Sequence, residues 1–141
     1  MGAQKQSGVK TAWTWVDDIK TVSLKVVADA TAFPSVADGV AYYTVPPELN
    51  GMNLVSIGAH VYTASDGGTA INISLCNGTT DMLTVQLTID NGANDSATAT
   101  TPATIDTDHD GVATANVLRV DVNQCGTNAK GFELRMGFQL P

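Results

Sequence analysis

The sequence predicts an all-β protein of the sandwich or barrel type, and three observations lead to that prediction. Thr and Val, which favour the pleated sheet, are abundant, whereas the acidic residues are twelve Asp and only two Glu. From residue 39 onward, apolar and polar residues alternate in short runs. These runs recur at spacings of about 8–14 residues, and nothing after residue 30 has a helical period.

Turn signals divide the alternating part of the chain into about eight strands. They are short clusters of Pro, Gly, Asn and Asp, and they lie at residues 46–47, 50–51, 66–68, 77–78, 90–96 and 106–111. The clearest strand is the last, because apolar residues alternate from Phe132 to Leu140 and predict one fully buried face. Alternation predicts the following inward set: Val55, Ile57, Val61, Ile71, Ile73, Leu75, Leu83, Val85, Leu87, Ile89, Val120, Val122, Leu134, Met136 and Phe138.

Residues 1–30 lie outside this pattern, and two interpretations of them stay open. The segment Thr21–Val27 is rich in β-branched residues and predicts a first strand. One helical face would also accommodate Ala12, Trp15, Ile19, Val22 and Val26. We expect extended structure, so the chain divides into an N-terminal arm or first strand over residues 1–30 and one domain over residues 31–141.

The charge of the chain is acidic and unevenly distributed. Its 141 residues include 7 basic and 14 acidic side chains, a formal net charge of −7. Residues 1–25 carry a net +2, whereas residues 26–141 carry a net −9. An acidic body repels phosphate backbones, so we expect no nucleic-acid partner. The basic arm either docks on an acidic protein surface or simply carries solvated lysines.

The sequence contains no membrane span of the helical kind. No apolar run approaches the roughly 18 residues that such a span requires, and we expect no membrane partner. The first residues have no apolar stretch after Lys5, so we also expect no secretory signal.

Motifs for catalysis are missing from the sequence. Its two histidines, His60 and His109, belong to no G-x-S-x-G or H-E-x-x-H pattern, and no nucleotide-binding glycine motif is present. Alternation places His60 on the polar face of a strand, where a solvated or interface histidine is expected. We therefore expect no enzymatic activity and name no catalytic residue.

The sharpest motif runs from Asp106 to Gly111, with the spacing D-x-D-x-D-G. This is the opening half of an EF-hand loop, in which alternate carboxylates converge on calcium and the glycine makes the turn. Asp106, Asp108 and Asp110 are therefore candidate calcium ligands. However, the twelfth position is Val117 rather than a bidentate Glu, and the flanking residues predict strands. The alternative is an Asp-rich solvated turn, with no cofactor bound.

The two cysteines, Cys76 and Cys125, both lie near predicted strand ends. Without a secretory signal, a reduced pair is the default expectation. A disulfide would require the two strand ends to be adjacent.

Several short pieces between Val40 and Pro141 resemble jelly-roll domains of tailed-phage virion structural proteins. They are Pro46–Leu54 with its Glu-Leu-Asn-Gly turn, Tyr62–Ser65, Asp81–Leu83 with Thr88–Asp90, Thr101-Pro102, Ile105-Asp106, Val112–Thr114, Leu118–Asp121 and Lys130-Gly131. The resemblance implies an antiparallel jelly-roll sandwich of about eight strands. Residues 1–30 carry none of it, so the extended N-terminal arm is an expectation from their own sequence.

The resemblance also implies a role in the virion. Such domains occur as capsid decoration (cement) proteins, which are usually homotrimers. This chain would be made in the host cytoplasm and would then bind the major capsid protein, on the outer capsid surface of the virion. Related domains also occur in tail fibres. The alternative is therefore a receptor- or glycan-binding domain of a tail fibre or spike, acting through loops at 64–68, 77–80 and 90–96.

The N-terminal arm is the candidate for contacts that reach beyond the body. Trp13 and Trp15 are two residues apart, so in a strand they share a face. Trp is enriched at binding hot spots, although the pair could instead cap the core. Together with Lys20 and Lys25, these are the residues that we expect to contact capsid subunits or a neighbouring copy.

Overall fold

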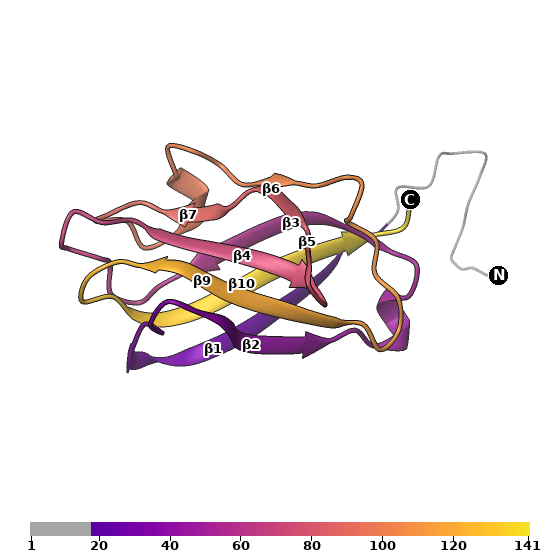
Figure 1. Ribbon diagram of the computed structural model, residues 1–141, viewed down its shortest axis with the longest axis horizontal. Coiled ribbons are helices and arrows are strands. Elements are labelled where there is room, and N and C mark those ends of the chain that lie inside the picture. Colours follow the sequence, from indigo (N-terminus) through magenta and orange to yellow (C-terminus); the bar gives the residue numbers. More distant parts are fainter. Residues whose placement is uncertain (1–17) are drawn as a thin grey trace.

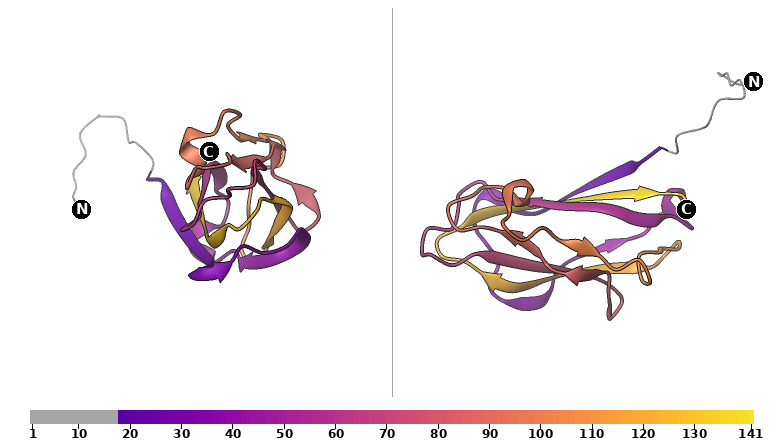
Figure 2. Two further views of the ribbon diagram at one scale, coloured as in Figure 1. Left: turned by 90° about the vertical axis from the view of Figure 1, so that its left-hand side faces the viewer. Right: turned by 90° about the horizontal axis from the view of Figure 1, so that it is seen from above.

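The computed structural model describes residues 18–141, which form an all-β domain of antiparallel strands (Figure 1). The predicted fold class is therefore confirmed at the level of all-β structure. Two larger sheets face one another across a single core (Figure 2). The only helical elements among the described residues are two short 3-10 helices, η1 at Pro47–Leu49 and η2 at Ser96–Thr98.

The first sheet has three strands, in the order β1-β10-β3. These are β1 at Lys20–Ala32, β10 at Lys130–Gln139 and β3 at Asn53–His60. The last strand of the chain is thus the central one, with an antiparallel neighbour on each side. Its inward residues, from Phe132 to Phe138, are at most 1% exposed, as the alternation predicts. The prediction is wrong for Leu140, which lies beyond the end of the strand and is 50% exposed.

The second sheet has the order β2-β9-β4-β5, and β7 also pairs with β4. Its strands are β2 at Ala37–Thr44, β9 at Val117–Cys125, β4 at Ile71–Asn77, β5 at Thr80–Asp81 and β7 at Leu87–Ile89. A separate two-stranded pair joins β6, at Leu83–Val85, to β8, at Thr104–Ile105. Residues 18–141 therefore contain ten strands where the sequence predicts about eight, mainly because several of them are only two or three residues long.

The core lies between the two larger sheets and is built from the predicted inward residues. Members that both the alternation and the structure place inside are Val61, Ile71, Ile73, Leu75, Leu83, Leu87, Ile89, Val120, Val122, Leu134, Met136 and Phe138. Burial of one such side chain stabilises the fold by about 1.5–3 kcal/mol. Phe33 joins them by packing on Phe132, with ring centroids 4.8 Å apart. The sequence missed Phe33 because it lies in a non-alternating connection.

Two members of the predicted inward set, Val55 and Ile57, belong to β3, where a bulge makes them more exposed than the alternation predicts. Val55 is 39% exposed, and Ile57 is only partly buried. The pairing with β10 shifts between Gly137 and Phe138, so that Phe138 is opposite Leu54 while Gly137 is opposite Ser56. Val55 is the extra residue of this bulge, and the buried position before it belongs to Leu54. The prediction for Val55 is therefore wrong.

The predicted strand over residues 83–89 is interrupted in the middle. Leu83–Val85 pairs with β8, whereas Leu87–Ile89 pairs with β4. Val85 lies where the chain changes sheets and is 36% exposed, so its prediction as a core residue is also wrong. Leu83, Leu87 and Ile89 are buried on either side of the break.

Residues 20–32 form a strand, which decides between the two interpretations of this segment. Strand β1 pairs with β10 and continues across the division that the sequence places between residues 30 and 31. Its inner side chains, among them Val22 and Leu24, pack partly buried against the core. The helical alternative for these positions is not adopted, and an arm separate from the sandwich would have to lie before residue 20.

Candidate functional site

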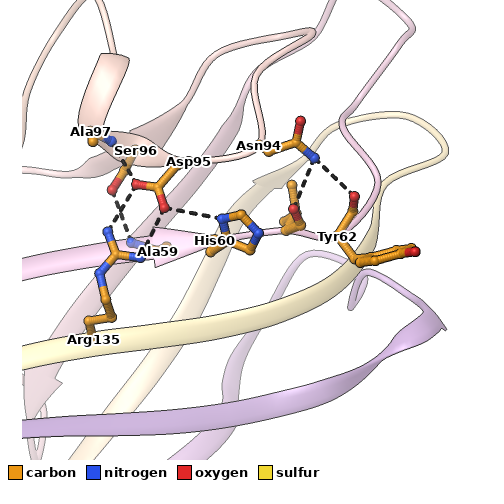
Figure 3. Close-up of polar contacts among 9 residues, drawn as sticks. Ala59, His60, Tyr62, Asn94, Asp95, Ser96, Ala97 and Arg135 are labelled. Atoms are coloured by element: carbon orange, nitrogen blue, oxygen red, sulfur yellow. Dashed lines mark hydrogen bonds and ion pairs between the residues drawn. The ribbon is translucent and has the colours of Figure 1, made fainter.

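The outer edge of β3 is closed by the loop at residues 94–96 instead of by a further strand (Figure 3). The Val61 amide donates to the Asn94 carbonyl at 2.8 Å. The Asn94 side chain donates back to the carbonyls of Val61 and Tyr62, at 3.1 and 3.0 Å. The Ala59 amide donates to Ser96 Oγ at 2.9 Å. Loop side chains thus satisfy backbone groups that an open sheet edge would leave unpaired.

Asp95, in the same loop, is the shared hydrogen-bond acceptor of a polar cluster on the outer face of the first sheet (Figure 3). Arg135 of β10 donates to both carboxylate oxygens, from Nη2 to Oδ1 at 2.9 Å and from Nη1 to Oδ2 at 3.0 Å. His60 Nδ1 lies 3.1 Å from Asp95 Oδ2, and the Ala97 amide donates to Oδ1 at 2.9 Å. One loop carboxylate therefore joins the end of β3 to the middle of β10.

The charge balance of this cluster stabilises the ionised carboxylate. The Arg135 hydrogen bonds, followed by those from the Ala97 amide and His60, lower the pKa of Asp95 to about 2, against the opposing effect of burial. The Asp95 hydrogen bond correspondingly raises the pKa of Arg135. A carboxylate held by an arginine in this way is a weak base, so the arrangement favours a structural or docking role over general-base catalysis.

Glycine at position 58 makes room for this interaction. Arg135 extends across β3 toward Asp95, and a Cβ atom at Gly58 would lie 2.5 Å from Arg135 Nη2. A side chain at this position would displace the guanidinium. Sequence reasoning missed the whole cluster because its members lie 35 and 40 residues apart and form no short motif. The only local signal is the Asn-Asp-Ser triplet, whose side chains often bond to nearby backbone groups.

The Asp106–Gly111 loop is an exposed turn with its own internal hydrogen bonds. Asp106 Oδ2 lies 2.8 Å from His109 Nδ1, and Asp106 Oδ1 accepts from the Asp108 amide at 3.0 Å. The His109 bond is the main cause of a lowered pKa for Asp106, and the same bond raises the pKa of His109. Across residues 18–141, no three His, Cys, Asp or Glu side chains are placed to hold a metal ion. Calcium binding by Asp106, Asp108 and Asp110 stays a prediction.

A polar surface pocket adjoins this loop. Its volume is about 330 Å³, and its lining residues are Asn77, Thr80, Asp108, His109 and Gly111. Asn77 is held there by donating to the Asn116 side chain at 3.0 Å. The pocket therefore joins one of the predicted loop sites, at 77–80, to the Asp-rich loop.

Cys76 belongs to a buried polar cluster within the second sheet. Asp121 is only 4% exposed, and it accepts two hydrogen bonds from Arg119, both 2.8 Å long. The Cys76 thiol donates to Asp81 at 3.1 Å. Burial, together with the neighbouring carboxylates, raises the pKa of Cys76 to about 12. Cys76 and Cys125 are both free thiols, and the raised pKa makes Cys76 a poor nucleophile at neutral pH.

The predicted partner-contact residues are placed in part. Lys20 begins β1, and Lys25 lies on its outer face, where its ammonium contacts Asp29 and is raised in pKa by that bond. Trp13 and Trp15 lie outside the described residues. Among the described residues, β1 has a strand on one side only, because the first sheet ends with it.

Comparisons with protein-family models, with curated proteins and with solved structures find no match to this chain. Within residues 18–141, no helix has the length and hydrophobicity to cross a bilayer.

Proposed function

We propose that this chain is a capsid decoration protein of a tailed phage, which binds the outer shell and stabilises it. The observation that carries the proposal is the order of the strands. The first sheet combines the first, the last and the third long strand, and the second sheet combines β2, β9, β4 and β7. Two sheets interleaved in this way are compatible with a jelly roll, the fold that the resemblance to phage virion proteins implies, and this compatibility supports the proposal.

The fourth position of the first sheet is taken by irregular chain in this proposal. Residues of this segment approach β3 at both ends, through isolated antiparallel bridges from Asp95 to His60 and from Gly111 to Asn53. In a regular jelly roll a strand would lie there. Side-chain bonds from Asn94 and Ser96 replace part of its ladder. The departure from eight regular strands is thus local, and the interleaved order supports the jelly-roll assignment.

A binding and non-enzymatic role suits the side chains of this body. The two histidines each contact an aspartate, His60 with Asp95 and His109 with Asp106. Asp95 is already held by Arg135, and Asp106 by a backbone amide. The partner would be the major capsid protein, with no nucleic acid or membrane involved. The protein would bind it on the outer surface of the virion. The homotrimer rests on the resemblance alone.

Electron microscopy of intact virions tests this proposal. Density for this protein distributed over the shell supports decoration, whereas density confined to the tail tip contradicts it. Deletion of residues 1–20 tests the role of Trp13, Trp15 and Lys20 and shortens β1 by only one residue. If the truncated protein folds but no longer binds shells that lack it, the arm is the anchor. If its affinity is unchanged, the contact surface lies on the sandwich body.

The second candidate is a receptor- or glycan-binding domain of a tail fibre or spike. The observation that favours it is the pocket at the 77–80 loop, lined by polar side chains that suit a hydroxylated ligand. Glycan-array binding that is lost in Asp108→Ala but retained in Asp29→Ala, an exposed aspartate of β1 outside the pocket and the three loops, would support this candidate. An array without binding would leave decoration as the better proposal.

A further inference from the structure

Three of the four outer edges of the two larger sheets are blocked against pairing with another strand. The edge of β3 is covered by the loop at 94–96. Strand β2 has a register shift between Ala37 and Ala41, and Pro46-Pro47 follows it. The remaining edge consists of β5 and β7, which are only two and three residues long. Covering, bulges, prolines and short strands are the ways in which folded proteins prevent edge-to-edge association.

In its first half the edge of β1 has no cover, bulge, proline or shortened strand, and its only protective feature is a lysine at each end, Lys20 and Lys25. From Lys20 to Lys25 the strand pairs residue by residue with β10, and the register shifts begin only after Lys25. The four residues between the lysines are Thr-Val-Ser-Leu, which are all uncharged, and Thr and Val among them favour strands. No strand among residues 18–141 pairs with the other side of β1, whose start lies at the margin of the molecule (Figure 2). Val22 and Leu24, on its inner face, are only partly buried.

We propose that the outer edge of β1 pairs antiparallel with β1 of a second copy of this chain. The two three-stranded sheets would then join into one continuous sheet of six strands. A two-fold contact of this kind uses the same edge on both copies, so a chain whose described residues offer one open edge can form it without a second site. The inference concerns only contacts between copies, so it does not depend on the proposed function.

The sequence of β1 is compatible with itself in one simple register. When Ser23 lies opposite Ser23 of the second copy, each Val22 faces the Leu24 of its neighbour on the inner side. On the outer side, each Thr21 faces a Lys25. Residues that face each other thus lie on the same side of the sheet, and no lysine opposes a lysine. The added strand would also cover Val22 and Leu24 further.

The charge of β1 differs in sign from that of the whole chain. The chain has a net charge of −7, so two copies repel one another. Strand β1 contains Lys20 and Lys25 against Asp29 and carries a net +1. The Asp-rich loop at 106–110 would instead bring like charges together. Contact through β1 therefore keeps the Asp-rich loops of the two copies out of the interface, and in the register above each Lys25 faces Thr21 rather than another lysine.

The mass of the particle in solution tests the pairing. We expect Ser23→Lys to halve the mass measured by light scattering, because two lysines would then face each other at the two-fold axis. Ser23 is exposed on the outer face, so the variant should keep its far-UV circular dichroism spectrum. Thr44→Lys makes the same charge change at an exposed position of β2 and should keep the wild-type mass. Equal masses of the wild type and Ser23→Lys would overturn the proposal.

The mass of Ser23→Lys relative to the wild type also distinguishes pairing through β1 from a trimer that forms through other surfaces. A pair of single chains would fall to one chain, and a pair of trimers would fall to one trimer, so either result supports pairing through β1. A trimer whose mass is unchanged in Ser23→Lys would support the trimer and overturn the edge pairing.

A cross-link tests the register. Facing residues of antiparallel strands have Cβ atoms about 4.5–5.5 Å apart, which is close to the geometry of a disulfide. With Cys125→Ser as background, Ser23→Cys should therefore form covalent dimers on mild oxidation, whereas Thr44→Cys should not. Dimers from Thr44→Cys alone, or from neither variant, would overturn the proposed contact.

Discussion

Asp95 accepts hydrogen bonds from two side chains and one backbone amide, although 30% of its side chain is exposed. Its pKa of about 2 lies below the ordinary value of 3.8. A depressed pKa in the folded state means that ionised Asp95 stabilises the fold above its unfolded pKa. This contribution is lost as the pH falls through the folded value.

We therefore predict a pH-dependent cost for Asp95→Asn. At pH 6 the substitution should lower the free energy of unfolding by about 1–2 kcal/mol, a range reduced for partial exposure. The difference from the wild type should shrink toward zero as the pH approaches 2, where Asp95 becomes protonated. Urea unfolding at a series of pH values measures this. A difference that stays constant from pH 6 to pH 2 would contradict the assignment.

Cys76 and Cys125 should differ in reactivity because only the first is buried beside carboxylates. With a pKa of about 12, Cys76 carries on the order of a thousandfold less thiolate at neutral pH than an ordinary cysteine. Iodoacetamide should therefore label Cys125 first in the native protein. The Cys125→Ser variant should label only after unfolding in guanidinium. Fast native labelling of that variant would show that the buried cluster opens readily.

At the scale of elements, the edge of β3 depends on single side chains from one loop. Ser96 Oγ is the acceptor for the Ala59 amide, and Ala59 is fully buried. Where a neighbouring strand pairs along an edge, many backbone hydrogen bonds together satisfy its polar groups. Here the loss of one hydroxyl leaves one buried amide without its partner.

We predict that Ser96→Ala lowers the free energy of unfolding by about 1–2 kcal/mol, the usual cost of a buried unsatisfied amide. Ser56→Ala is the matched control, because Ser56 is an exposed serine of β3, the strand that contains Ala59. This substitution should change the free energy of unfolding by less than about 0.5 kcal/mol. Chemical denaturation measures both. Equal effects of the two substitutions would mean that the loop contributes no net stabilisation to the edge.

Alternation predicted the strands well where pairing is regular and failed at individual irregularities. The whole inward face of β10 follows from its period of two, because the strand pairs without a break on the β1 side over Lys20–Lys25. A bulge in β3 and a change of sheet after β6 exposed Val55 and Val85. Both irregularities depend on the neighbouring strand, so no local pattern in the sequence reports them.

For the molecule as a whole, the two β-sheets share one core. Truncation of a side chain at the centre of this core should lower the free energy of unfolding far more than truncation at its margin. We predict that Leu134→Ala lowers the free energy of unfolding by about 2–5 kcal/mol, because Leu134 is fully buried between the sheets. Val55→Ala should cost less than about 1 kcal/mol, since the bulge leaves Val55 partly exposed. Thermal or urea unfolding compares them. A large loss in Val55→Ala would indicate that another copy or partner covers this position.

The all-β class, the turns and most inward residues were determined by the sequence alone, because composition, period two and turn residues act over short stretches of chain. The sequence predicted extended structure at Thr21–Val27, but only the tertiary structure showed that residues 20–32 form an edge strand of the sandwich, because this requires pairing with β10. The tertiary structure also decided the cluster of His60, Asp95 and Arg135, and the closure of β3 by a loop. These contacts join residues far apart in the chain, and the order in which strands pair, which brings them together, is not written in any local pattern.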